Sequence, residues 1–126
     1  MPNPGHYIPG VCNIGPAETK ARMKSGWGGL AATLILGAAL FGLNAAPAWR
    51  LIVFFPATIA ATGFLQGAWH FCLGFGFKAL FNFGELGTTD SVEQAEFRRL
   101  DRNKAWTILL SSLAIGLAVA LLAFFS

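Results

Sequence analysis

The sequence predicts an all-α integral membrane protein with three transmembrane helices, at about residues 27–46, 48–71 and 105–125. The chain has 126 residues, of which 55% are hydrophobic and only 12% charged, whereas soluble domains carry about 25% charged residues. A chain of this length forms one small core, which cannot hide so much apolar surface from water. The composition therefore favours a lipid bilayer as the surroundings of most of the chain.

Residues 1–26 precede the first predicted span and are rich in proline and glycine. This composition disfavours a long helix. We therefore expect a cytoplasmic N-terminal tail that closes on a short basic helix at 17–24, followed by a three-helix transmembrane domain over 27–126. No cleavable signal peptide is expected, because the segment lacks an apolar core.

The three predicted spans have the length that a bilayer requires. Residues 27–46 are twenty residues without a charge, and residues 105–125 are another uncharged stretch of twenty-one. At about 1.5 Å of rise per residue, such stretches cover roughly 30 Å, which is the thickness of the hydrocarbon layer. The span at 48–71 contains Pro56, which is expected to kink it.

Residues 74–104 form the predicted cytoplasmic loop between the second and third spans. Its first part, 74–84, is aromatic and glycine-rich, and we expect it to be a re-entrant or interfacial segment. Asp90 and Glu93 have the spacing of a capping box, with Asp90 as the N-cap. A cytoplasmic helix is therefore expected from about residue 91, with a sequence that allows it to continue into the third span.

Lysine and arginine set the predicted orientation. Eight of the nine basic residues precede the first span or lie between the second and third, and Arg50 alone falls on the other side. The positive-inside rule then places the N-terminus in the cytoplasm and the C-terminus outside, as in a multi-pass protein of the bacterial inner (cytoplasmic) membrane. The expected membrane-interface residues are the four tryptophans at the span boundaries and the basic run of the loop: Trp27, Trp49, Trp69, Trp106, Arg98, Arg99, Arg102 and Lys104.

Two histidines and two cysteines form a candidate metal-ligand set: His6, Cys12, His70 and Cys72. On the predicted topology all four lie near the cytoplasmic face, and imidazole with thiolate suits zinc or another soft-ligand metal. Their spacing matches no metal motif, however, and free cysteine is commonly a small buried hydrophobe. His70 alone is a candidate ligand of a haem or pigment, and the alternative is an interfacial histidine bonded to water or headgroups. The cofactor therefore stays open among none, lipid, haem, pigment and metal.

Small residues recur at four-residue spacing in each predicted span, a pattern that lets helix backbones approach closely. We call these patterns small-residue ladders. They consist of Ala38 and Gly42 in the first span, Gly63 and Gly67 in the second, and Ser112, Gly116 and Ala120 in the third. Packing among the protein's own helices is the favoured interpretation, and docking onto another membrane subunit or a second copy is the alternative. Three ladders are enough to serve both.

A resemblance to a known family covers residues 26–74. This segment has a Gly/Ala-rich apolar helix, a Pro-containing turn and a second apolar helix, marked by Gly26 to Gly42, Ala46-Pro47, Thr62-Gly63-Phe64 and Phe71-Cys72. In this order it resembles the YgaP-like transmembrane hairpin family of small bacterial inner-membrane proteins. The resemblance implies a membrane hairpin with a cysteine at its cytoplasmic end. The family pattern has no third span, and the rhodanese domain of some members is absent here, so sulfur-transfer chemistry is not implied.

No arrangement of residues typical of an enzyme is visible. The sequence has no glycine-rich phosphate loop, no nucleophile–base motif and no charge near the middle of a span. The basic residues adjoin a span and lack interleaved exposed aromatics, which argues against nucleic-acid binding. We therefore expect a non-catalytic accessory or structural subunit of a larger membrane complex, of the respiratory or photosynthetic type, with lipids and other integral subunits or itself as partners. The alternative is a membrane protein that binds a metal, haem or pigment through His70 with Cys72, Cys12 and His6, in a redox or sensing role.

Overall fold

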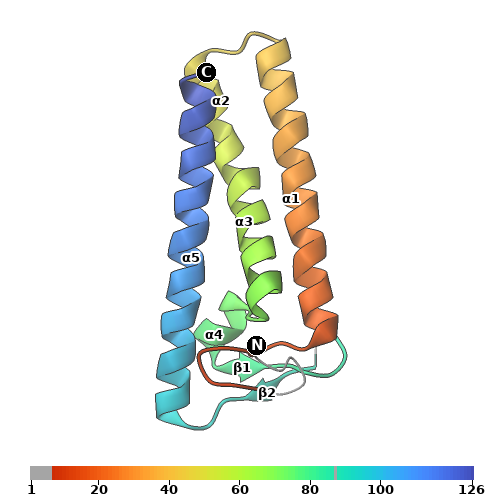
Figure 1. Cartoon of the computed structure of the whole chain (residues 1–126), viewed down its shortest axis with the longest axis vertical. Helices are drawn as coiled ribbons and strands as arrows, with labels where there is room; N and C mark the ends of the chain where they lie inside the picture. Colours follow the sequence, from red (N-terminus) through yellow and green to blue (C-terminus); the bar gives the residue numbers. More distant parts are fainter. Residues whose placement is uncertain (1–6, 87) are drawn as a thin grey trace.

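A computed structural model describes residues 7–86 and 88–126 of the chain. It contains three helices long and apolar enough to span a membrane, Pro16–Gly42, Pro47–Trp69 and Ala95–Phe124. Helix α1 (Pro16–Gly42) and helix α5 (Ala95–Phe124) both pack against α3 (Phe54–Trp69), which lies between them (Figure 1). The prediction of a mainly helical chain with three helices of membrane-spanning length is confirmed, whereas their orientation in a membrane stays a prediction.

Helix α1 begins much earlier than the predicted span at 27–46. It starts at Pro16, so the basic segment 17–24, expected as a short helix of its own, is the first part of one long helix. Proline suits the first position of a helix because the N–H it lacks has no partner there, and no other proline follows until Pro47. The helix ends at Gly42, four residues before the predicted boundary, where Asn44 turns into the left-handed region with φ 53°.

The second predicted span consists of three pieces rather than one regular helix. Helix α2 (Pro47–Arg50) leads through a 3-10 turn, Leu51–Val53, into α3. Proline at position 56 has no N–H to donate to the carbonyl of Ile52, which accounts for the irregular turn at the expected kink. Helix α3 ends at Trp69, two residues before the predicted boundary at 71, because His70 adopts the left-handed conformation with φ 53°.

The segment between the second and third spans folds into a short helix and a two-stranded sheet. Helix α4 (Leu73–Lys78) begins one residue before the predicted interfacial segment 74–84 and covers its first part. Strand β1 (Leu80–Phe81) pairs antiparallel with β2 (Asp90–Ser91). The prediction of Asp90 as a helix N-cap is wrong. Asp90 pairs with Phe81, and the N–H of Val92 donates to the carbonyl of Ala79 at 2.8 Å, so the backbone here is extended. Helix α5 begins at Ala95 and continues unbroken through the predicted third span.

The loop at residues 7–15 packs beneath the helices and joins the turns that follow them (Figure 1). The N–H groups of Asn13 and Ile14 both donate to the carbonyl of His70, at 3.1 and 3.3 Å. The N–H of Asn82 donates to the carbonyl of Asn13 at 2.9 Å, and the N–H of Gly15 donates to the carbonyl of Asn82 at 2.8 Å. We call this assembly of residues 7–15, 70–72 and 79–82 the basal cluster.

Candidate binding surfaces

Two of the three small-residue ladders pack against neighbouring helices of the same chain. A Cβ atom on Gly63 would collide with the backbone of Gly26 in α1, and one on Gly67 would collide with the side chain of Met23. Ser112, Gly116 and Ala120 are all buried in α5, and a Cβ atom on Gly116 would collide with the hydroxyl of Thr58. Close approach of backbones at these positions therefore joins α1 and α5 to α3.

The ladder of α1 has no such contact in the part of the chain that the structure describes. Ala38 and Gly42 are exposed, and no atom lies within 4 Å of the place where a Cβ on Gly42 would be. With 3.6 residues per turn they share one side of the helix with three further exposed residues. We call this side the outer face of α1, and it consists of Ala31, Leu34, Ile35, Ala38 and Gly42. The buried residues of α1 are Glu18, Gly26 and Gly29, all in its first half.

An apolar groove lies where α3 separates α1 from α5. It has a volume of about 310 Å³, with Ala57, Ala60 and Ala61 of α3 among its lining residues. Thr33 of α1 also lines it, but its hydroxyl donates to the carbonyl of Gly29 at 2.7 Å and is thereby satisfied within the helix. This groove offers hydrocarbon surface and no free charge.

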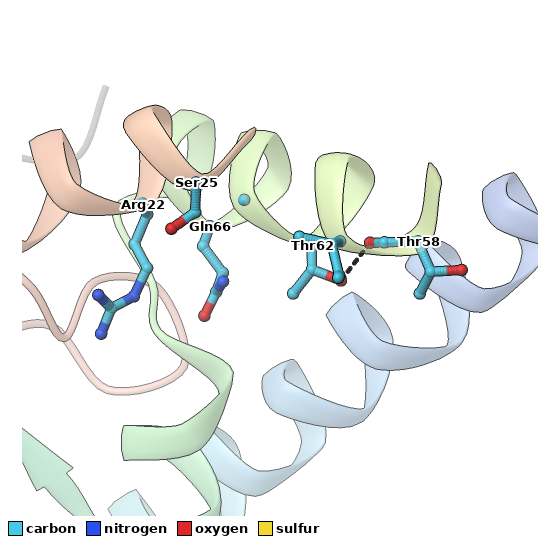
Figure 2. Close-up of a pocket in the computed structure, with 7 residues that line it drawn as sticks. Arg22, Ser25, Thr58, Thr62 and Gln66 are labelled. Atoms are coloured by element: carbon cyan, nitrogen blue, oxygen red, sulfur yellow. Dashed lines mark hydrogen bonds between the residues drawn. The ribbon is translucent and has the colours of Figure 1, made fainter. Parts of the chain in front are cut away.

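A second groove, of about 370 Å³, runs between α1 and α3 and has polar side chains. Figure 2 shows Arg22 and Ser25 of α1 beside Gln66 of α3, with Thr62 and Thr58 further along the same helix. Gln66 is buried, and its Oε1 accepts a hydrogen bond of 3.0 Å from the N–H of Leu73. We call this the polar groove.

Cys72 and His70 lie together at the base, next to the start of α1. The guanidinium of Arg22 donates to the sulfur of Cys72 at 3.1 Å and lies 3.6 Å from the carboxylate of Glu18. Nδ1 of His70 is 3.3 Å from the hydroxyl of Thr19. His70 therefore sits in the turn after α3, where a side chain of α1 engages its ring.

The other two members of the candidate metal set are placed differently. Cys12 is fully buried, and its thiol donates weakly to the carbonyl of Ile14 at 3.6 Å. Burial raises the pKa of the Cys12 thiol, which disfavours a thiolate there. His6 lies outside the described residues. Within residues 7–86 and 88–126, no group of three His, Cys, Asp or Glu side chains is arranged to hold a metal ion.

Asn13 is a central residue of the basal cluster that sequence reasoning missed. Its side-chain oxygen accepts a hydrogen bond of 2.7 Å from the N–H of Cys72, and its Nδ2 donates to the carbonyl of Cys72 at 3.2 Å. Asn13 is completely buried. The only hint in the sequence is a polar side chain between Cys12 and Ile14, which does not reveal its partner.

Asp101 is the second such residue, and it ties the N-terminal loop to α5. Its carboxylate accepts hydrogen bonds from the hydroxyl of Tyr7 at 2.5 Å and from the N–H of Gly10 at 2.7 Å. The side chain is completely buried although it belongs to the first turns of α5. The signal in the sequence is an acidic residue within the basic run 98–104.

The predicted interface residues are mostly exposed. Trp27, Trp49 and Trp106 are 61%, 64% and 49% exposed, which is consistent with an aromatic belt. Trp69 is partly buried, and the ammonium of Lys104 lies 4.3 Å from its ring centroid. The arginines of the run take different roles. Arg98 donates to the carbonyls of Val92 and Glu93, Arg99 lies 3.6 Å from Glu96, and Arg102 is exposed.

Comparison of the chain with protein-family models, with curated proteins and with solved structures gives no match. The resemblance of residues 26–74 to the YgaP-like hairpin family therefore stays a prediction. Function has to be inferred from the two grooves, the basal cluster and the outer face of α1.

Proposed function

We propose that this protein is a non-catalytic accessory subunit of a larger membrane complex, and that the outer face of α1 docks against a transmembrane helix of another subunit. The observation that carries the proposal is the exposure of the second half of α1. Past Gly29 this helix has no buried residue, and Leu34 and Ile35 are 65% and 71% exposed. No other element within residues 7–86 and 88–126 covers this face.

The composition of the outer face supports a helix rather than lipid alone as its neighbour. Gly42 and Ala38 lie between large side chains, so a second helix could approach closely over them. Glycine inside a helix is about 1 kcal/mol less favourable than alanine, and neither Gly37 nor Gly42 has an internal contact that explains it. Because the face has no charged side chain, the partner surface is expected to be apolar and small-residue-rich.

The distribution of charge supports an orientation with the basal cluster in the cytoplasm. Eight of the nine basic residues lie in the first half of α1, in α4 or in the first turns of α5, and Arg50 in α2 lies at the opposite end. This arrangement fits the positive-inside rule in a bacterial inner membrane. The proposed complex is of the respiratory or photosynthetic type, in which this chain contributes helix packing and assembly.

The test is a purification of the tagged full chain from its source membrane in a mild detergent, followed by mass spectrometry of the intact particle. We expect stoichiometric co-purification with larger membrane subunits. Gly42→Leu is expected to release the chain while leaving its own helix packing intact, because the position faces open space. Ala114→Leu, on an exposed position of α5, is the matched control.

Three outcomes contradict the proposal. The wild-type chain runs alone, it crosslinks only to further copies of itself, or Gly42→Leu retains the partner as well as Ala114→Leu does. An absorbance spectrum of the same preparation tests the alternative role of His70. A haem or pigment band that is lost in His70→Ala would favour the cofactor-binding function over the accessory role.

A further inference from the structure

The polar groove has a head end that is rich in hydrogen-bond donors. Arg22 and Ser25 of α1 face it beside Gln66 of α3 (Figure 2). The Oε1 atom of Gln66 is taken by the N–H of Leu73, which leaves the amide Nε2 as a donor. A guanidinium has five N–H donors. In Arg22 one terminal nitrogen contacts the sulfur of Cys72 and the other contacts the carboxylate of Glu18, so N–H donors remain for a ligand. Converging guanidinium, hydroxyl and amide donors suit the oxygens of a phosphate.

The other end of the groove offers hydrocarbon instead. The hydroxyl of Thr62 donates to the carbonyl of Thr58 at 2.7 Å and is satisfied within α3. The hydroxyl of Thr58 is buried and lies against Gly116 of α5. The Thr62 hydroxyl is therefore already hydrogen-bonded, and the Thr58 hydroxyl lies against α5, so neither is offered to a ligand in the groove. Ile59 adds a further apolar side chain to the lining. The groove changes from polar to apolar along its length.

The direction of this change matches that of a lipid in the proposed membrane. Ser25 comes just before the exposed Trp27, and Gln66 lies one turn before Trp69, so the head end is at the level of the basal interface. Thr58 lies eight residues before Gln66, about 12 Å further into the bilayer at the helical rise. A headgroup at the polar end would thus leave an acyl chain pointing toward the bilayer centre.

We propose that the polar groove binds one anionic phospholipid of the leaflet at the base, with its phosphate at Arg22, Ser25 and Gln66. One acyl chain lies along Thr62, Ile59 and Thr58. The nearby basic residues Lys20 and Lys24 of α1 are exposed and favour an anionic over a zwitterionic headgroup. Glu18 is buried against Arg22. The apolar end of the groove distinguishes a lipid from a free phosphate ion. This site lies away from the outer face of α1 and does not depend on the proposed partner.

The test uses the full chain in a nonionic detergent with added phosphatidylglycerol or phosphatidylcholine, and native mass spectrometry counts the lipids retained. We expect one phosphatidylglycerol per chain and about tenfold weaker retention of phosphatidylcholine. Arg22→Gln removes the charge at the head end, and Ser25→Trp fills it. Each is expected to weaken phosphatidylglycerol retention by about tenfold or more. The matched controls are Arg102→Gln for the charge and Leu110→Trp for the bulk, both at exposed positions of α5 outside the groove, and both are expected to bind as the wild type does.

Ser25→Trp still tests the proposal if Arg22→Gln unfolds the base of the molecule. Arg22 also contacts Cys72 and Glu18, whereas Ser25 is exposed on α1. An unchanged melting temperature of Ser25→Trp together with lost lipid supports the site. Equal retention of both lipids overturns the proposal, as does wild-type binding by Ser25→Trp. Displacement of the lipid by inorganic phosphate alone also overturns it, because the groove would then be a site for a free anion.

Discussion

The base of the molecule and the far half of its three long apolar helices, which we call the spanning part after their proposed role, are held together by different forces. At the base, buried polar groups such as Asn13 and Asn82 bond to backbone that has left regular helix. In the spanning part, contact depends on small residues such as Gly63 and Gly116 that let backbones approach. The second half of α1 has neither kind of contact, since its last buried residue is Gly29.

This difference follows from where backbone hydrogen bonds are available. A helix satisfies its own N–H and C=O groups, so inside a membrane little remains for specific polar bonds and packing is decided by shape. His70 and Ala79 adopt left-handed conformations that end α3 and α4, and the freed groups must find partners elsewhere. The base therefore fixes the three helices relative to one another, while the far half of α1 keeps the exposed face on which the proposed docking depends.

Asn13→Ala is the change expected to damage the base most. It removes the partner of the buried Cys72 N–H and one of the two hydrogen bonds to the Cys72 carbonyl, which keeps the bond from the N–H of Gly76. One unsatisfied buried group and one lost hydrogen bond together are expected to cost about 3 kcal/mol. Thermal unfolding in detergent, followed by circular dichroism, measures the effect, and alkylation of Cys72 is expected to become fast. Asn103→Ala, at an exposed position of α5, is the control. Equal melting temperatures for the two variants would show that the base does not hold the fold together.

Gly63→Leu tests the spanning part in the same way. The new side chain would meet the backbone of Gly26 and Arg22 in α1, which cannot move aside as a side chain can. Overpacking of this kind is expected to cost about 3 kcal/mol. Gly37→Leu is the matched control, because no atom lies within 4 Å of its Cβ position. A pair of cysteines introduced to crosslink α1 to α3 would report whether the two helices separate in Gly63→Leu. Crosslinking as efficient as without this substitution would contradict a role for the contact between Gly63 and Gly26.

Sequence reasoning succeeds for the spanning part and largely fails for the base. Apolar stretches of bilayer length are a local signal, so the three helices could be predicted, and the ladders at Gly63 and Ser112 follow from spacing alone. The start of α1 at Pro16 is not predicted, because proline and glycine dominate the residues before it, although neither residue type occurs again until Gly26. The helix start at Asp90 was wrong because pairing with Phe81, nine residues away, outweighs the local capping pattern.

The base depends on contacts between residues far apart in the chain. Asn13 bonds to Cys72, 59 residues away, and Tyr7 bonds to Asp101, 94 residues away. No local pattern encodes such pairs, since a buried asparagine looks like any loop asparagine in the sequence. The sequence predicts Cys12 and Cys72 as metal ligands. In the structure Asn13, next to Cys12, is the residue that joins the N-terminal loop to the backbone of Cys72.

Tyr7→Phe is expected to loosen the N-terminal loop without unfolding the helices. A hydrogen bond to a carboxylate contributes about 1.5 kcal/mol or somewhat more, and the N–H of Gly10 would still bond to Asp101. Hydrogen exchange at residues 8–14 should rise while exchange in α3 stays constant. Asp101→Asn is the companion variant. If exchange rises equally in the loop and in α3, the loop and the helices form one cooperative unit and the comparison between them does not hold.

The same contact has a predictable dependence on pH. Burial, followed by the hydrogen bond and the charge of Asp101, raises the pKa of the Tyr7 phenol above its usual value. The folded state therefore favours the neutral phenol, and this contribution is complete below about pH 10 and is lost as the pH rises above it. Exchange in the loop should increase above that pH in the wild type. Tyr7→Phe, which has no phenol to ionise, should not show the step.

Ser112→Ala is expected to have the smallest effect, and in the opposite direction. Its hydroxyl is buried on α5 and has no hydrogen-bond partner among the described residues. Removing an unsatisfied buried hydroxyl relieves its desolvation cost, so stability should stay equal or rise by up to about 1 kcal/mol. Thr62→Val is the matched control, because it removes a hydroxyl that does bond, to the carbonyl of Thr58. A clear loss of stability in Ser112→Ala, larger than that in Thr62→Val, would mean that a polar bond acts in the spanning part as it does at the base. The contrast between a polar base and shape-determined spans would then have to be abandoned for α5.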